Sequence, residues 1–172
     1  MMRILLILAA LIALAAAALY LGPEPAANRH GYFDDAPDVC AEIIAHGGGQ
    51  GHAPPNTMLA LERALQMGAE VLEVDVQQTR DGVMILRHDD TLDRTTDMTG
   101  LIADYDWAQL ESADAGARTV IGGESYAGRG ITIPRLDAAL AAFPDARWIL
   151  EIKNDTQSAA LAMCEAIRGA GA

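Results

Sequence analysis

The chain has 172 residues, 51% of them hydrophobic, which suits one domain of ordinary size with a sizeable core. Its formal net charge of −12, from 24 acidic and 12 basic residues, argues against nucleic-acid or anionic-membrane binding, because phosphate groups need Lys and Arg to neutralise them. The same balance is compatible with a small anionic substrate that is held by a metal ion.

An apolar segment opens the chain. Arg3 is followed by uncharged, mostly apolar residues at 4–21, and Pro23 and Pro25 end any helix. This length lies between a signal peptide, with about 7–15 apolar residues, and a membrane span, with about 20. We expect residues 1–22 to form a hydrophobic helix, an uncleaved anchor rather than a cleaved signal peptide, and residues 23–40 to be a linker. The remainder is then exported, either anchored in the inner membrane facing the periplasm or released as a periplasmic or secreted protein.

A strand, a glycine-rich loop and a helix are predicted in succession after the linker. Residues 42–45 form a short apolar strand that ends at His46, and glycine dominates 47–51. Asn56 or Thr57 can cap the helix that follows. One such unit indicates an α/β fold.

The rest of the chain alternates further strands and helices. Strands are expected at 71–76, 83–88 and 148–153, and helices at 107–112, 134–142 and 156–168. The turn at 79–82 is shorter than the dozen or so residues of a parallel crossover, which suggests a hairpin, although the sequence alone does not decide this. Residues 89–133 are otherwise polar and irregular.

Acidic side chains occur where a core strand should be apolar. Glu73 and Asp75 are two residues apart, so they point to one face of their strand, and Glu151 repeats this on the last strand. Carboxylates on one inward face repel each other unless a cation lies between them. Oxygen-only ligands suit Mg²⁺ or Ca²⁺. A solvated edge strand is the plainer explanation for each acid taken alone.

Two histidines close apolar strands at their carboxyl ends, the ends at which parallel α/β folds build sites. His46 and His88 suit acid and base roles near neutral pH, and the glycines after His46 allow the backbone to approach an anion. Taken alone, each histidine could be structural, the glycine run could be a flexible loop, and Lys153 could be a surface lysine. Their occurrence together at strand ends favours a functional site.

A set of short motifs runs in order from about residue 41 to 160. They are Ala45-His46 with Gly48, Pro54-x-Asn56-Thr57, Glu73-Val74-Asp75-Val76, Thr79-Arg80-Asp81-Gly82, His88-Asp89, Leu92-Asp93-Arg94-Thr95-Thr96, Ile133-Pro134-x-Leu136 and Glu151-Ile152-Lys153. As a set they resemble the glycerophosphodiester phosphodiesterase family.

The resemblance implies a TIM (β/α)₈ barrel and metal-dependent hydrolysis of glycerophosphodiesters to sn-glycerol 3-phosphate and an alcohol. The expected small-molecule partner is a glycerophosphodiester or a lysophospholipid. Carried over by motif, the metal ligands are Glu73, Asp75 and Glu151, the acid/base pair is His46 and His88, and the substrate-binding residues are Lys153, Gly48 and Asn56. The divalent cation is expected to be Mg²⁺ or Ca²⁺.

Two positions depart from the family pattern. Gly47 stands where the family usually has Arg, and Pro55 where it usually has Glu. We hypothesise that an interacting pair was lost as a unit, which removes a bidentate phosphate donor. Arg87 and His52 are the candidates that would replace it.

Length is the third departure. An eight-stranded barrel takes about 250 residues, whereas residues 41–172 hold only about four of eight βα units. We therefore expect a C-terminally truncated domain, which is either a fragment or a half that pairs with another half. Expressed alone, it is expected to be aggregated or molten.

Two other functions remain open. A phospholipase D of the sphingomyelinase type shares the two histidines and the acidic set on a similar barrel. A catalytically inactive, membrane-anchored binding fragment is the alternative from a different class.

Overall fold

The computed structural model describes residues 42–171. The apolar segment 1–22, with its predicted hydrophobic helix, and the linker 23–40 lie outside this range. None of the helices between residues 42 and 171 is long and apolar enough to cross a membrane.

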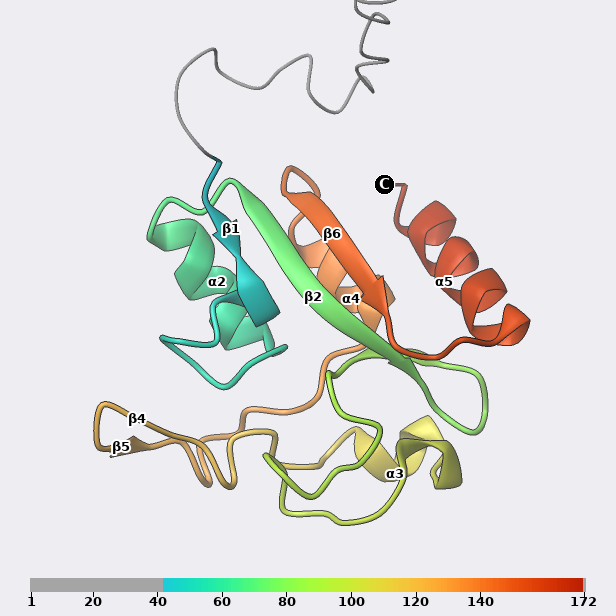
Figure 1. Cartoon of the computed structure of the whole chain (residues 1–172), viewed down its shortest axis with the longest axis horizontal. Helices are drawn as coiled ribbons and strands as arrows, with labels where there is room; N and C mark the ends of the chain where they lie inside the picture. Colours follow the sequence, from blue (N-terminus) through green and yellow to red (C-terminus); the bar gives the residue numbers. More distant parts are fainter. Residues whose placement is uncertain (1–41, 172) are drawn as a thin grey trace, which may run out of the picture. The chain divides into compact units, whose positions relative to one another are not determined.

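Strand β2 (Val71–Gln78) is the centre of the sheet. It runs parallel to β1 (Ile44–Ala45) on one side and to β6 (Arg147–Ile152) on the other (Figure 1). The register with β6 sets Asp75 directly opposite Glu151. The carboxyl ends of β1, β2 and β6 therefore meet at one edge of the sheet.

Strand β3 (Met84–Leu86) confirms the hairpin and corrects the expected number of barrel units. It pairs antiparallel with the end of β2, because the turn between them is closed by hydrogen bonds from Gly82 N to Thr79 O and from Thr79 N to Val83 O. Such a turn reverses the chain direction and leaves no room for a crossover. Residues 42–171 thus hold three parallel strands of a barrel rather than four.

One face of the sheet is apolar and packs against helices. Leu72, Val74 and Val76 alternate along β2 and are fully buried. They share a core with helices α2 (Met58–Gln66), α4 (Leu136–Ala142) and α5 (Gln157–Ala170). Burial of each such side chain contributes about 1.5–3 kcal/mol. The opposite face of β2 is left for the polar residues between them.

Residues 89–133 hold more structure than their polar composition predicts. This segment contains η3 (Ile102–Asp104), α3 (Trp107–Leu110), and a small hairpin of β4 (Val120–Ile121) and β5 (Glu124–Ser125). Leu92, Ile102 and Leu110 pack with Ile85 and Ile133 in a second core. This core fixes the loop that follows His88.

The glycine-rich loop includes the short helix η2 (His46–Gly48), which lies against α2. Gly48 is buried and has a φ of 68°, and a Cβ at this position would lie 2.8 Å from Leu61 Cδ2. Close packing and a left-handed backbone both require glycine here. Gly48, predicted to bind substrate, therefore has a structural reason to be glycine.

Replacement of Gly48 by Ala is expected to lower the free energy of unfolding by at least about 1–2 kcal/mol, the cost of a left-handed conformation with a Cβ. Urea unfolding of the full chain measures the change. Gly51→Ala is the matched control, because a Cβ at Gly51 meets no atom within 4 Å. Equal stability of the two variants would contradict the packing described for Gly48.

Candidate active site

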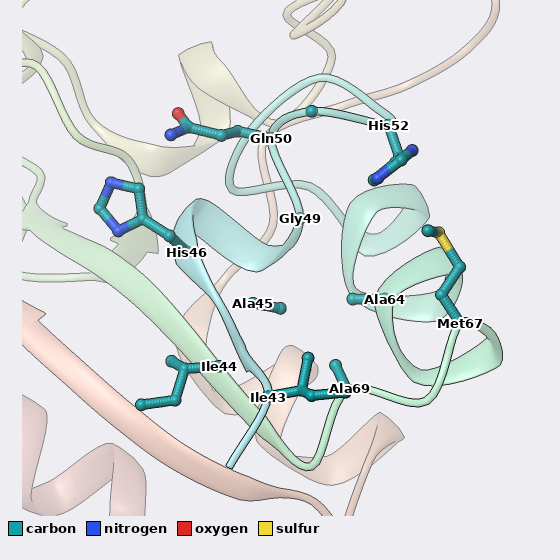
Figure 2. A pocket seen from close by; sticks show the side chains of 11 residues that line it. Ile43, Ile44, Ala45, His46, Gly49, Gln50, His52, Ala64, Met67 and Ala69 are labelled. Carbon is teal, nitrogen blue, oxygen red and sulfur yellow. The ribbon is translucent and has the colours of Figure 1, made fainter. Parts of the chain in front are cut away.

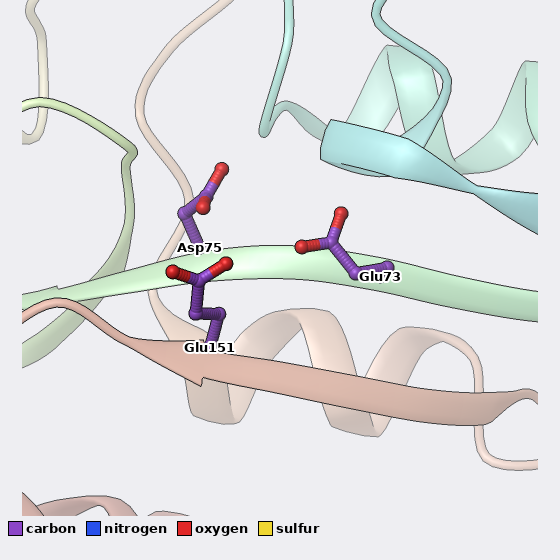
Figure 3. A group of neighbouring side chains, drawn as sticks. All are labelled: Glu73, Asp75 and Glu151. Carbon is purple, nitrogen blue, oxygen red and sulfur yellow. The ribbon is translucent and has the colours of Figure 1, made fainter.

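Three carboxylates converge on the polar face of the sheet. Glu73 and Asp75 rise from β2 and Glu151 from β6, all toward the same side (Figure 3). One ligand atom of each lies within 4.8 Å of the others. Their predicted convergence is thus observed, and it follows from the two-residue period of β2 together with the register that sets Asp75 against Glu151.

Asp75 is the most buried of the three, with 2% of its surface exposed. Its Oδ2 accepts a hydrogen bond from Asn56 Nδ2 at 2.8 Å, and its backbone N–H donates to Asn56 Oδ1 at 3.0 Å. Asn56 adopts a φ of 57°, a conformation that asparagine tolerates better than most residues. The two bonds leave Asp75 Oδ1 buried without a well-aligned hydrogen bond.

Lys153 lies among the acids. Its Nζ is 2.8 Å from Asp75 Oδ1 and 2.5 Å from Glu151 Oε1. Burial alone would lower the pKa of Lys153, but the hydrogen bonds and charges of Asp75 and Glu151 raise it above the ordinary value. A cluster that holds an ammonium between carboxylate oxygens fits a hard divalent cation as well, because both are positive charges and such cations prefer oxygen ligands.

His46, the first residue of η2, contacts the acid cluster. Its Nδ1 lies 2.8 Å from Glu73 Oε2, which also accepts the backbone N–H of Gly47 at 2.7 Å. At this distance Nδ1 is paired with the Glu73 carboxylate, which leaves Nε2 for other partners. Both of these contacts are made by Oε2 of Glu73, and Oε1 takes part in neither.

The ring of His88 is also paired with a carboxylate through Nδ1. Its Nδ1 lies 2.8 Å from Asp89 Oδ1, and Gln77 Nε2 donates to the backbone oxygen of His88 at 3.1 Å. Arg94 in turn donates to both oxygens of Asp89, from Nε at 2.5 Å and from Nη2 at 3.0 Å. The hydrogen bond from Arg94 is the main reason that the pKa of Asp89 falls to about 2.

Both imidazoles border one polar hollow of about 270 Å³. Its lining residues are His46, Gln50, Pro55, Asn56, Asp75, His88, Asp89 and Arg94. With Nδ1 of each ring tied to a carboxylate, the Nε2 atoms are the nitrogens available to a bound molecule. The hollow thus has two groups able to move protons beside the acid cluster.

A second, largely apolar pocket of about 340 Å³ lies between β1 and α2 (Figure 2). His52 lines this pocket and not the polar hollow. Arg87 is 5% exposed and donates to Thr95 Oγ1 and to the backbone oxygen of Thr91, and burial lowers its pKa to about 10. Neither candidate for replacing the arginine missing at Gly47 lines the polar hollow.

Arg94, Asp89 and Gln50 line the hollow and had no predicted role. Asp89 and Arg94 stand inside the motifs His88-Asp89 and Leu92-Asp93-Arg94. Their positions in those motifs were the available signal, but the ion pair between them depends on how the loop after β3 folds. Gln50 gave no signal beyond its place in the glycine-rich loop.

The three parallel strands, the helices on their apolar face and the cluster of acids and histidines belong to an α/β fold of the kind that builds TIM barrels. The chain belongs to the glycerophosphoryl diester phosphodiesterase family, whose family model matches residues 46–170. A glycerophosphodiester phosphodiesterase of Caldanaerobacter subterraneus subsp. tengcongensis is 36% identical over 111 residues, which cover 64% of this chain and 44% of the relative. One from Bacillus altitudinis is 49% identical over 74 residues, 43% of this chain and 30% of the relative.

Solved structures give the same relationship. The glycerophosphoryl diester phosphodiesterase domain of an uncharacterized protein from Mycobacterium tuberculosis superposes with a TM-score of 0.72 and 28% identity, over 77% of this chain and 50% of that chain. A phosphodiesterase of Oleispira antarctica, solved in complex with the product sn-glycerol-3-phosphate, gives a TM-score of 0.67 and 34% identity, over 74% and 52%. The chain spans about half the length of these two structures.

Replacement of Asn56 by Asp is expected to destabilise the fold by about 1–3 kcal/mol, because a carboxylate oxygen would replace the amide that donates to Asp75. Urea unfolding measures the effect. In the control, Asn154→Asp, the oxygen that accepts the N–H of Gln78 is kept. If both variants lose the same stability, the Asn56–Asp75 contact is not what holds the acid cluster.

Replacement of Arg94 by Gln is expected to raise the pKa of Asp89 from about 2 toward the ordinary value of about 3.9. Because the folded-state pKa is the lower one, the ion pair stabilises the protein above pH 4 and this contribution is lost as the pH falls toward 2. Carboxyl ¹³C shifts followed from pH 6 to pH 2 report the midpoint. In Arg135→Gln, which breaks a similar pair with Asp137, the midpoint of Asp89 should not move.

Proposed function

We propose that the protein hydrolyses glycerophosphodiesters to sn-glycerol 3-phosphate and an alcohol with a bound divalent cation. The observation that carries this proposal is the pair of imidazoles, each tied at Nδ1 to a carboxylate and both bordering one hollow beside the three acids. Membership of the family and the product bound in the Oleispira antarctica relative support it.

Glu73, Asp75 and Glu151 are the proposed ligands of the cation, Mg²⁺ or Ca²⁺. Such a cation neutralises charge that develops on the phosphoryl oxygens. A cation held by the three acids would compete with Lys153 for Asp75 and Glu151, and Lys153 is the proposed phosphate-contacting lysine. Asn56 acts through Asp75, whose carboxylate it orients.

The two histidines are the proposed acid and base. One Nε2 accepts the proton of the neighbouring glycerol hydroxyl as its oxygen attacks phosphorus, and the other Nε2 donates a proton to the departing alkoxide oxygen. The product of this step is a cyclic phosphate and the free alcohol. Water then opens the ring with the two proton transfers reversed, which gives sn-glycerol 3-phosphate.

The first measurement is cation binding by the full chain. Calorimetric titration with Ca²⁺ or Mg²⁺ is expected to show one site that weakens at least about tenfold in Asp75→Asn, since a charged buried ligand is lost. Asp137→Asn, on α4 and outside the cluster, is the control. Binding that is equal in both variants would remove the three acids as the cation site.

The second measurement is turnover. His46→Ala and His88→Ala are each expected to lower release of choline from glycerophosphocholine by about 10²–10⁴-fold with cation affinity retained, because each removes one proton carrier. His52→Ala, outside the hollow, is the control. Preference for sphingomyelin would instead assign a phospholipase D of the sphingomyelinase type, and cation binding with no turnover would assign a binding fragment.

We also propose export, with the domain outside the cytoplasm and held at the inner membrane or released. The support is the apolar stretch at 4–21 preceded by Arg3. Fractionation of cells that express the full chain, with protease added to intact spheroplasts, tests this. Protection of the domain from the protease would contradict export.

A further inference from the structure

Arg94 is the one fixed cation among the residues that line the polar hollow. The other charged groups of the lining are the carboxylates of Asp75 and Asp89, and the two imidazoles complete the ionisable set. Lys153 is held by Asp75 and Glu151 in the acid cluster and does not line the hollow. An anion that enters the hollow therefore meets a single permanent positive charge on its wall.

The contacts of Arg94 leave part of its guanidinium free. A guanidinium has five N–H donors in a planar fork. Nε and Nη2 each give one hydrogen bond to Asp89, and no contact of Nη1 is found among residues 42–171. Three N–H groups remain, two on Nη1 and one on Nη2, and two of these are parallel at the end of the side chain. With 57% of the side chain exposed, this end is open to a ligand.

Two further donors that could serve an anion are already used. The backbone N–H of Gly47 is donated to Glu73 Oε2, and this residue has no side chain to offer. The guanidinium of Arg87 is buried with Thr91 and Thr95. A phosphodiester, which carries one negative charge on two non-bridging oxygens, matches the spacing of the two parallel N–H groups of Arg94.

We propose that Arg94 binds the phosphoryl group of the substrate through this free end, while its other edge holds Asp89 and thereby orients His88. This inference rests on the proposed function. One planar group then fixes both the phosphate and the carboxylate that sets the tautomer of His88.

The test is the affinity of the full chain for sn-glycerol 3-phosphate and for inorganic phosphate at saturating Ca²⁺, measured by calorimetry. In Arg94→Gln both dissociation constants are expected to rise about 10- to 100-fold, the range for hydrogen bonds to a charged group. Arg94→Lys should recover only part of the affinity, because an ammonium keeps the charge without the fork. Ca²⁺ affinity should not fall, since Arg94 makes no hydrogen bond to the three acids and its charge, which acts on Asp75, opposes a cation there.

Arg135→Gln is the matched control, because Arg135 makes the same Nε and Nη2 pair with Asp137 on a helix away from the hollow. A role limited to holding Asp89 would lower kcat and leave the dissociation constants unchanged, so the affinity separates the two roles. Unchanged phosphate affinity in Arg94→Gln, with glycerophosphocholine still hydrolysed by the wild-type chain, would overturn this assignment and leave the proposed function standing. If the wild-type chain binds neither Ca²⁺ nor sn-glycerol 3-phosphate, both fall.

Discussion

Repulsion among three clustered carboxylates, two of them buried, is the constraint on which this structure depends. Asp75 is 2% exposed and lies directly across the sheet from Glu151, with Glu73 two residues before it. Such a group is stable only if positive charge and hydrogen-bond donors surround it. Lys153 supplies the charge, and Asn56 and the backbone of Gly47 supply the donors. The left-handed backbone of Asn56 and the folded glycine-rich loop follow from this need.

Strand β2 carries both the acid cluster and part of the hydrophobic core, because one of its faces is polar and the other is apolar. Leu72, Val74 and Val76 pack against the helices, and Glu73, Asp75 and Gln77 carry the site. A shift of one residue in register would send the acids into the apolar core. The core that stabilises the domain and the placement of the acids are thus fixed by the same pairing of β2 with β6.

The fold and the site were predictable from the sequence where apolar and polar residues alternate regularly, and much less so where they do not. The two-residue period places Glu73 and Asp75 together, and the carboxyl end of the parallel strand β1 points to His46. His88 also borders the hollow, but β3 is antiparallel, so the rule for parallel strands does not explain its position. The antiparallel direction of β3 was left open, because a four-residue turn allows a hairpin without proving one. Arg94 had no predicted role, because its contact with Asp89 requires the fold of residues 89–133. That segment is held by a scattered core of Leu92, Ile102 and Leu110, whose spacing follows no helix or strand pattern.

The position of Lys153 has a consequence for how the acid cluster behaves in solution. A tethered ammonium already balances Asp75 and Glu151, so the cluster keeps its shape without help from outside the chain. A cation from solution would compete with the ammonium of Lys153, which is attached to the chain and is therefore always present at the cluster. A cation that bound there would have to displace this ammonium, so its apparent affinity would be set by competition with a group of the protein itself.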